Sequence, residues 1–161
     1  MKNEPEFFVR QIDDLKTVDL TALVNESRAE GFRFLERLQD DYFRGLNRFE
    51  EPGEGLYGIF SRDGELHGIG GLNRDPFSRD HKTGRIRRFY IRKVLRDKGL
   101  GSLLLNSIIS DGGKQFTAFV LYTDTKEAAA FYERRGFHRE DRQKKISHRY
   151  ELQPGEGGMG R

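Results

Sequence analysis

The sequence predicts one mixed α/β domain whose sheet is not regularly doubly wound. A chain of 161 residues suits a single domain with a core large enough to fold alone. Strand-like and helix-like periodicities follow one another in the order strand, two helices, three strands, helix, strand, helix and two strands, without an internal repeat. We therefore expect one domain over residues 1–152, followed by a glycine-rich and disordered tail at residues 153–161.

The first third of the chain predicts one strand and two helices. "FFVRQI", residues 7–12, has the apolar content of a strand, and Asp19 is a candidate cap for the helix after it. That helix carries Leu20, Leu23, Val24 and Ser27 at helical spacing. A second helix is predicted from about residue 34 to 46, with Leu35, Leu38, Tyr42 and Leu46 on one side. Gly31 is expected to separate the two helices.

The middle of the chain predicts a hairpin, a further strand and a helix. "EEPGEG" has turn chemistry, and "LYGIF" and "ELHGIGGL" flank "SRDG", which is typical of a hairpin turn. The polar loop "NRDPFSRDHKTG" leads to a strand over residues 85–91. The helix after it has Leu100, Leu103, Leu104 and Ile108 on one stripe.

The last third predicts strand, helix and two closing strands. "FTAFVLY", residues 116–122, has the length and the β-branched and aromatic content of a buried strand. "KEAAAFYERR" predicts a short helix that Gly136 ends. "FHRED" and "SHRYEL" predict the two strands that close the domain.

Composition excludes several kinds of site. There is no cysteine, so disulfides, thiolate zinc sites and a cysteine nucleophile are excluded. The four histidines show no paired ligand spacing, and no metal is expected. The N-terminus lacks a hydrophobic signal core, and the longest apolar run is far shorter than a membrane span. These features predict a cytoplasmic protein without a membrane partner.

The positive charge is local rather than general. The chain has 29 basic and 26 acidic side chains, and the basic excess is concentrated in "RIRRFYIRKVLRDK". This stretch is compatible with a solvated basic face, with a nucleic-acid surface, or with a site for a phosphorylated small molecule. A nucleic-acid surface is disfavoured because no known nucleic-acid-binding signature accompanies the charge.

The stretch "RDKGLG", residues 96–101, favours the third interpretation. It lies between a predicted strand and a predicted helix, where unpaired backbone N–H groups and the helix dipole attract anions. Gly99 and Gly101 lack a Cβ, so a phosphate can approach the backbone, and Arg96 and Lys98 add charge. The sequence has no GxxxxGK[ST] motif, and "GLGSLL" lacks the third glycine of a Rossmann fingerprint.

Two segments together resemble the GCN5-related N-acetyltransferases (GNAT). "RDKGLG" resembles the R/Q-x-x-G-x-G/A signature of this family, and "AAAFYERRGF" resembles its second signature, a tyrosine-bearing helix that ends in Gly-Phe. The resemblance extends over residues 6–152. It implies the GNAT acyl-CoA N-acyltransferase fold, with a mixed and mostly antiparallel sheet of about seven strands and about four helices.

The resemblance also implies acetyl-CoA as co-substrate. The backbone amides of residues 97–102 would hold the coenzyme's pyrophosphate, and the backbone of Ile91 would bind the pantetheine arm and steady the oxyanion. Thr125 occupies a position where an asparagine often bonds the coenzyme, and its hydroxyl could still do so. The residues implied in coenzyme binding are Ile91, Arg96, Asp97, Lys98, Gly99, Leu100, Gly101, Ser102 and Thr125.

The strand before the turn has an irregular pattern. Its bulky apolar residues are Ile86, Phe89 and Ile91, so the period-two alternation slips by one between residues 86 and 89. An inserted residue, a β-bulge, explains the slip, and the resemblance implies that such a bulge admits the coenzyme. A strand buried on both faces, which needs no alternation, is the alternative.

The resemblance makes Tyr132 the acid that meets the leaving thiolate. Some family members carry a glutamate base at the position of Arg85, so a base must come from elsewhere or be absent. Glu26 and Glu30, near the predicted helix break at Gly31, and Asp75 are candidates. Glu30 is preferred because the resemblance implies that this helix break lines the acceptor side.

The sequence therefore predicts an acetyl-CoA-dependent N-acetyltransferase in which the amine of a small molecule or peptide attacks directly in a ternary complex. A non-catalytic acyl-CoA-binding or sensing module on the same fold is the alternative, and nucleic-acid binding ranks third. The acceptor is not identified, and a homodimer is left open.

Overall fold

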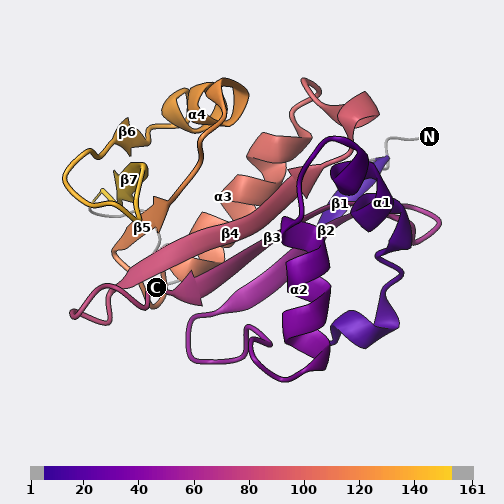
Figure 1. The fold of residues 1–161 in the computed structure, drawn as a ribbon, viewed down its shortest axis with the longest axis horizontal. Coiled ribbons are helices and arrows are strands. Elements are labelled where there is room, and N and C mark those ends of the chain that lie inside the picture. The colour runs from indigo at the N-terminus through magenta and orange to yellow at the C-terminus, as the bar shows by residue number, and fades with distance from the viewer. Residues whose placement is uncertain (1–5, 154–161) are drawn as a thin grey trace.

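The computed structural model describes residues 6–153 (Figure 1), and most of the predicted tail lies outside this range. The predicted element order is confirmed, with two short 3-10 helices in addition. The elements are β1 (Phe7–Gln11), η1 (Leu15–Thr17), α1 (Thr21–Ala29), α2 (Phe34–Phe43), β2 (Gly55–Ser61), β3 (Leu66–Arg74), β4 (Thr83–Ile91), η2 (Lys93–Leu95), α3 (Leu100–Gly112), β5 (Ala118–Leu121), α4 (Lys126–Glu133), β6 (His138–Arg139) and β7 (His148–Glu151).

The strands form one seven-stranded sheet in the order β1-β2-β3-β4-β5-β7-β6. Only the pairing of β4 with β5 is parallel, and the remaining pairs are antiparallel. The parallel pair is joined by α3, as a parallel connection requires a crossover. The prediction of a mixed, mostly antiparallel sheet is therefore confirmed.

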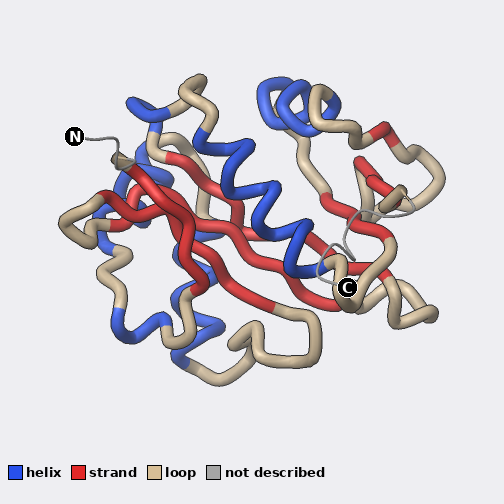
Figure 2. Tube along the Cα trace, turned by 180° about the vertical axis from the view of Figure 1, so that it is seen from behind, coloured by secondary structure: helices blue, strands red, loops and turns tan. Residues whose placement is uncertain are grey.

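Helices cover the two faces of the sheet unequally. In Figure 1, α1 and α2 lie in front of the strands at the right, and Figure 2 shows α3 across the opposite face. The α1–α2 side encloses one apolar core, which includes Leu23, Leu38 and Ile69. The α3 side encloses a second core around Leu104 and Phe119. No described helix lies in front of β5 and β7 in Figure 1.

Three apolar residues that the sequence placed on buried faces are exposed in the structure. Leu46 is 66% exposed because α2 ends at Phe43, before Gly45 takes a φ of 77°. Leu103 is 41% exposed, and Leu105 takes its place in the buried stripe. Tyr122, predicted at the end of a buried strand, lies beyond β5 and is 59% exposed.

The predicted bulge is present in β4. Ile69 and Gly71 of β3 pair with Tyr90 and Arg87, so two residues of β4 oppose one of β3. The first of the two extra positions, Arg88, has a φ of 59°. Beyond the bulge β4 has no strand beside it on the β5 side, because the pairing of β4 with β5 extends only over Thr83–Arg85. A gap therefore opens between the two parallel strands.

No helix of residues 6–153 is both long enough and apolar enough to cross a bilayer.

Candidate acyl-coenzyme site

The turn between β4 and α3 presents unused backbone donors. None of the N–H groups of residues 97–102 donates a hydrogen bond to another described residue, whereas the Leu103 N–H already bonds the Gly99 carbonyl at 3.1 Å. Asp97 and Gly99 have φ angles of 64° and 84°, which bend the chain sharply into α3. Consecutive free N–H groups at a helix N-terminus form a binding site for an anion.

The two positions of this turn, 99 and 101, need glycine for different physical reasons. Gly99 has a left-handed conformation and open space around it, so its value lies in backbone freedom. A Cβ at Gly101 would lie 2.8 Å from a ring carbon of Phe131 on α4. Gly101 therefore lets α3 approach α4 closely, in addition to any room that it leaves for a ligand.

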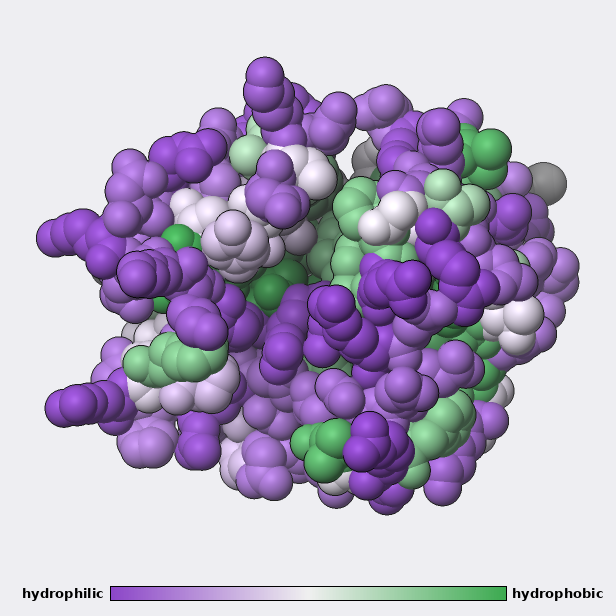
Figure 3. Space-filling view, viewed as in Figure 1, coloured by the Kyte–Doolittle hydropathy of each residue, from purple (hydrophilic) through white to green (hydrophobic). Residues whose placement is uncertain are grey.

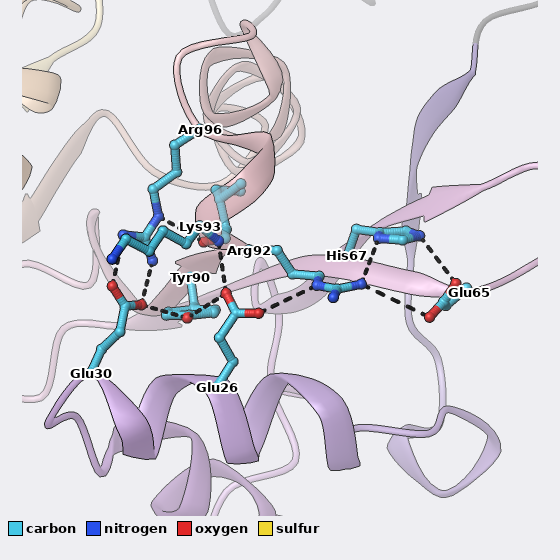
Figure 4. Close-up of polar contacts among 9 residues, drawn as sticks. Glu26, Glu30, Glu65, His67, Tyr90, Arg92, Lys93 and Arg96 are labelled. Carbon is cyan, nitrogen blue, oxygen red and sulfur yellow. Dashed lines mark hydrogen bonds and ion pairs between the residues drawn. The ribbon is translucent and has the colours of Figure 1, made fainter.

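Glu26 on α1 and Glu30 at the C-cap of this helix hold the turn in place (Figure 4). Glu30 accepts hydrogen bonds from both terminal nitrogens of Arg96, at 2.6 and 3.0 Å, and from the Tyr90 hydroxyl at 2.5 Å. Glu26 accepts from the Lys93 N–H at 2.7 Å and from the same Tyr90 hydroxyl at 2.9 Å. Both carboxylates therefore serve to fix the end of β4 and the start of the turn.

These contacts make both carboxylates poor proton acceptors. The hydrogen bonds from Arg96 lower the pKa of Glu30 and outweigh the opposing effect of burial. Burial raises the pKa of Glu26, but hydrogen bonds from the Lys93 N–H and the Tyr90 hydroxyl outweigh it and lower the pKa overall. Both groups remain ionised and engaged at neutral pH.

Arg96 links the end of β4 to the end of α1 through its hydrogen bonds. Its Nε donates to the Ile91 carbonyl at 2.9 Å, and its two other nitrogens are taken by Glu30. Lys98 is exposed beside the free amides. Of the two charges expected at the turn, only that of Lys98 is uncommitted among the described residues.

The backbone of Ile91 faces the gap between β4 and β5. The next N–H along the strand, that of Arg92, bonds the His67 carbonyl of β3 at 3.1 Å. Because successive N–H groups of a strand point to opposite sides, the Ile91 N–H points away from β3. The donor expected to meet an oxyanion is thus directed into the opening that the bulge creates.

Tyr132 is packed beside the bulge. Its ring is 5% exposed and meets the ring of Phe89 edge-on, with centroids 5.8 Å apart. Burial raises the pKa of the phenol. Its hydroxyl makes no hydrogen bond to the other residues of 6–153. A phenol that stays neutral can donate a hydrogen bond to a developing thiolate, although the raised pKa makes it a weaker acid for full transfer of the proton.

Thr125 and Ser102, which are also predicted to bind the coenzyme, form hydrogen bonds within the protein. Thr125 caps α4, and its hydroxyl oxygen accepts from the Ala128 N–H at 3.2 Å. Ser102 receives a hydrogen bond from Arg135, which also covers Phe131. The contact of Arg135 with Ser102 joins the residues after α4 to the start of α3, so the two signature segments lie side by side.

Asp75 and Arg85 form a buried ion pair. Arg85 Nε lies 2.9 Å from an oxygen of Asp75, whose side chain is 2% exposed. Arg85 also donates to the Lys145 carbonyl at 2.9 Å. Asp75 therefore neutralises Arg85, which stands where some family members carry a glutamate, and within residues 6–153 it makes no hydrogen bond to Tyr132.

Sequence reasoning missed Tyr90 and Arg92. Tyr90 bonds both glutamates, and Arg92 lies 3.4 Å from Glu26 and donates its backbone N–H to β3. The two glutamates lie 60 to 66 residues away along the chain, so no local pattern indicated these contacts. No group of three potential metal ligands occurs in the described part of the chain.

The comparisons with known proteins identify the family. The sequence profile of the acetyltransferase (GNAT) family matches residues 20–137, which is well over half of the chain. The chain therefore belongs to the GNAT acetyltransferase family, as the two signatures indicated. Among curated proteins no sequence matches this chain significantly.

Solved structures share the fold. A protein of Exiguobacterium sp. 255-15 assigned as an acetyltransferase is 26% identical, with a TM-score of 0.82 over 91% of this chain and 94% of that chain. An acetyltransferase of Streptococcus agalactiae 2603 is 20% identical, with a TM-score of 0.70 over 91% and 99%. The AtaT toxin, solved with acetyl-CoA and the C-terminus of its antitoxin AtaR, is 14% identical, with a TM-score of 0.64 over 91% and 94%.

Proposed function

We propose that this protein is an acetyl-CoA-dependent N-acetyltransferase that acts on the amine of a small molecule or peptide in a ternary complex. The free N–H groups of residues 97–102 at the start of α3 carry the proposal, because they match an anionic pyrophosphate. Lys98 and the family membership support it. A cytoplasmic location remains a prediction.

The proposed reaction uses few protein groups. The neutral amine attacks the thioester carbon, a C–N bond forms and the C–S bond breaks. The Ile91 N–H would stabilise the oxyanion, and the Tyr132 hydroxyl would donate its proton to the leaving thiolate and regain one from solvent. The proton lost by the attacking nitrogen passes to solvent.

The second candidate is an acyl-CoA-binding or sensing module without catalysis. The ion pairs of Glu30 and Asp75 favour it, because they leave neither carboxylate uncommitted. The neutral Tyr132 phenol beside the bulge favours the enzyme.

Calorimetric titration with acetyl-CoA, followed by a thiol-release assay over amines, polyamines, amino acids and peptides, tests the proposal. Binding together with acetylation of at least one amine is the expected result. Binding without turnover on any acceptor would support the module, and absence of binding would contradict both.

The pH dependence of turnover separates the two routes for the amine's proton. Of the routes that the sequence leaves open, the ion pairs favour the one without a dedicated carboxylate base. We expect kcat/KM to rise with pH toward the pKa of the acceptor amine, with the same profile in Glu30→Gln. A rising limb well below the amine's pKa that disappears in Glu30→Gln would instead make Glu30 the base.

A further inference from the structure

Three arginines on β4 take no part in the proposed coenzyme site. Arg85 and Arg87 are two residues apart and therefore project from the same face of the strand. The bulge turns Arg88 to this face as well, because its guanidinium lies 3.7 Å from Asp41 on α2. Phe89, the other bulge residue, packs on the opposite face against α4. We name Arg85, Arg87 and Arg88 the β4 arginine cluster.

The cluster is incompletely neutralised. Arg88 has Asp41 at 3.7 Å, and Arg87 has only a long contact of 3.4 Å to the Asn73 amide oxygen. Arg87 forms no ion pair with a carboxylate of residues 6–153. Arg85 is paired with Asp75, yet its Nη2 is buried without a hydrogen-bond partner among the described residues.

Burial makes this arrangement costly. The Arg88 side chain is 13% exposed, and burial together with the charge of Arg87 lowers the pKa of Arg88 to about 10. Burial and the charge of Arg85 lower the pKa of Arg87. Both remain cations at neutral pH. An anion that bound the two guanidinium groups would relieve their repulsion and satisfy their donors.

Of the cluster, Arg87 lines a surface pocket of about 530 Å³, and Asp41, the ion-pair partner of Arg88, lines it too. Arg87 and Asn73 form one part of its lining, and Glu50, Glu51 and Glu54 form another. Cationic and acidic side chains therefore line one pocket, and Arg87 offers it a guanidinium group that has no carboxylate partner among residues 6–153. In the view of Figure 3, strongly hydrophilic side chains gather at the middle of the molecule beside a hollow that has apolar residues at its floor.

The cluster also lies close to the proposed reaction centre along the chain. Arg88 is the residue before Phe89, whose ring contacts Tyr132. The gap between β4 and β5 begins just after Arg85. An amine that entered the gap from the α2 side would therefore leave the rest of its molecule over the β4 arginine cluster.

We propose that the acceptor is a small amine that carries a carboxylate or a phosphate, and that Arg87 and Arg88 bind this anionic group. The inference rests on the proposed function, since it names the acceptor class of the same site. Arg85 adds charge to the cluster from a buried position and remains tied to Asp75.

Matched pairs of amines test the acceptor class. L-Leucine is compared with L-leucinamide, and phosphoethanolamine with ethanolamine, in the thiol-release assay. Because the neutral amine is the nucleophile and the members of a pair differ in amine pKa, kcat/KM is expressed per unprotonated amine. We expect a higher value for the anionic member of at least one pair, and the better pair identifies carboxylate or phosphate. In Arg87→Gln and in Arg88→Gln, kcat/KM for that anionic amine should fall about tenfold or more, and that of its neutral partner less than about twofold.

Arg10→Gln on β1 is the control, because it removes the same charge from a distant strand. Its kinetics should match those of the wild type. Equal loss for anionic and neutral amines in the cluster variants, or a preference for the neutral members, would overturn the inference while the N-acetyltransferase assignment stands.

Anion binding by the cluster is also measured without any acetyl transfer, so that this inference can fail or hold independently of the proposed function. Thermal unfolding is followed with increasing inorganic phosphate in the wild type and in the Arg87→Gln, Arg88→Gln double variant. The phosphate-dependent rise in Tm should be smaller in the double variant, even though phosphate also reaches the coenzyme turn. Equal rises would overturn anion binding by the cluster, whether or not any amine is acetylated.

Discussion

A Gly101→Glu variant is expected to lose at least about a hundredfold in affinity for acetyl-CoA while it remains folded. The substitution places a carboxylate among the free N–H groups where the pyrophosphate is proposed to bind, and like charges there repel. It also adds a Cβ 2.8 Å from the Phe131 ring, which has to shift. Calorimetry with acetyl-CoA, together with thermal unfolding, measures the two effects separately.

Gly101→Gln is the matched control, because glutamine has almost the same shape without the charge. Both variants disturb Phe131 alike, so the difference in acetyl-CoA affinity between them reports the electrostatic effect at the turn. If Gly101→Glu binds acetyl-CoA as tightly as Gly101→Gln, the pyrophosphate does not lie at residues 97–102, and the proposed coenzyme site is wrong.

The fold was predictable because its signals are local. The alternation of apolar and polar residues in β4 shifts by one between Ile86 and Phe89 because of the bulge. An extra residue in a strand moves every later side chain to the other face. Gly31 and Gly136 mark real helix ends, with φ angles of 92° and 97°. Errors arose where helix ends and faces depend on packing, as at Leu46 and Leu103.

The inner organisation of the site was not predictable, because its contacts join distant segments. Arg96 was expected to offer its charge to the coenzyme, but Glu30, 66 residues away in the sequence, occupies it. The same contact turns the preferred base candidate into a structural anchor. Nothing in either segment alone indicates the pair, since an arginine in a turn and a glutamate at a helix end are each compatible with solvent exposure.

Arg85 organises its surroundings through two contacts. At this position some family members carry a glutamate, whereas here a guanidinium binds Asp75 and the Lys145 carbonyl. This contact ties the loop after β3 to the loop before β7. Arg85 stands in one row with Arg87 and Arg88 on β4, which is the row proposed to bind the anionic group of the acceptor.

Tyr132→Phe is expected to lower kcat by about a hundredfold and to leave the Kd for acetyl-CoA within about twofold. The hydroxyl matters most when negative charge develops on the leaving sulfur, so its loss affects the transition state more than the ground state. The phenylalanine ring would keep the packing against Phe89 and Phe137. Because burial holds the phenol neutral, this loss should persist across the neutral pH range.

Tyr42→Phe provides the control, since it removes another buried hydroxyl, on α2 and on the opposite face of the sheet. Steady-state kinetics with one acceptor and calorimetry with acetyl-CoA are measured on both variants. Tyr42→Phe should retain turnover within about twofold, because its hydroxyl has only a long contact of 3.4 Å to Asp14. Equal kcat in Tyr132→Phe and the wild type would make Tyr132 a packing residue, and the acid would have to be solvent.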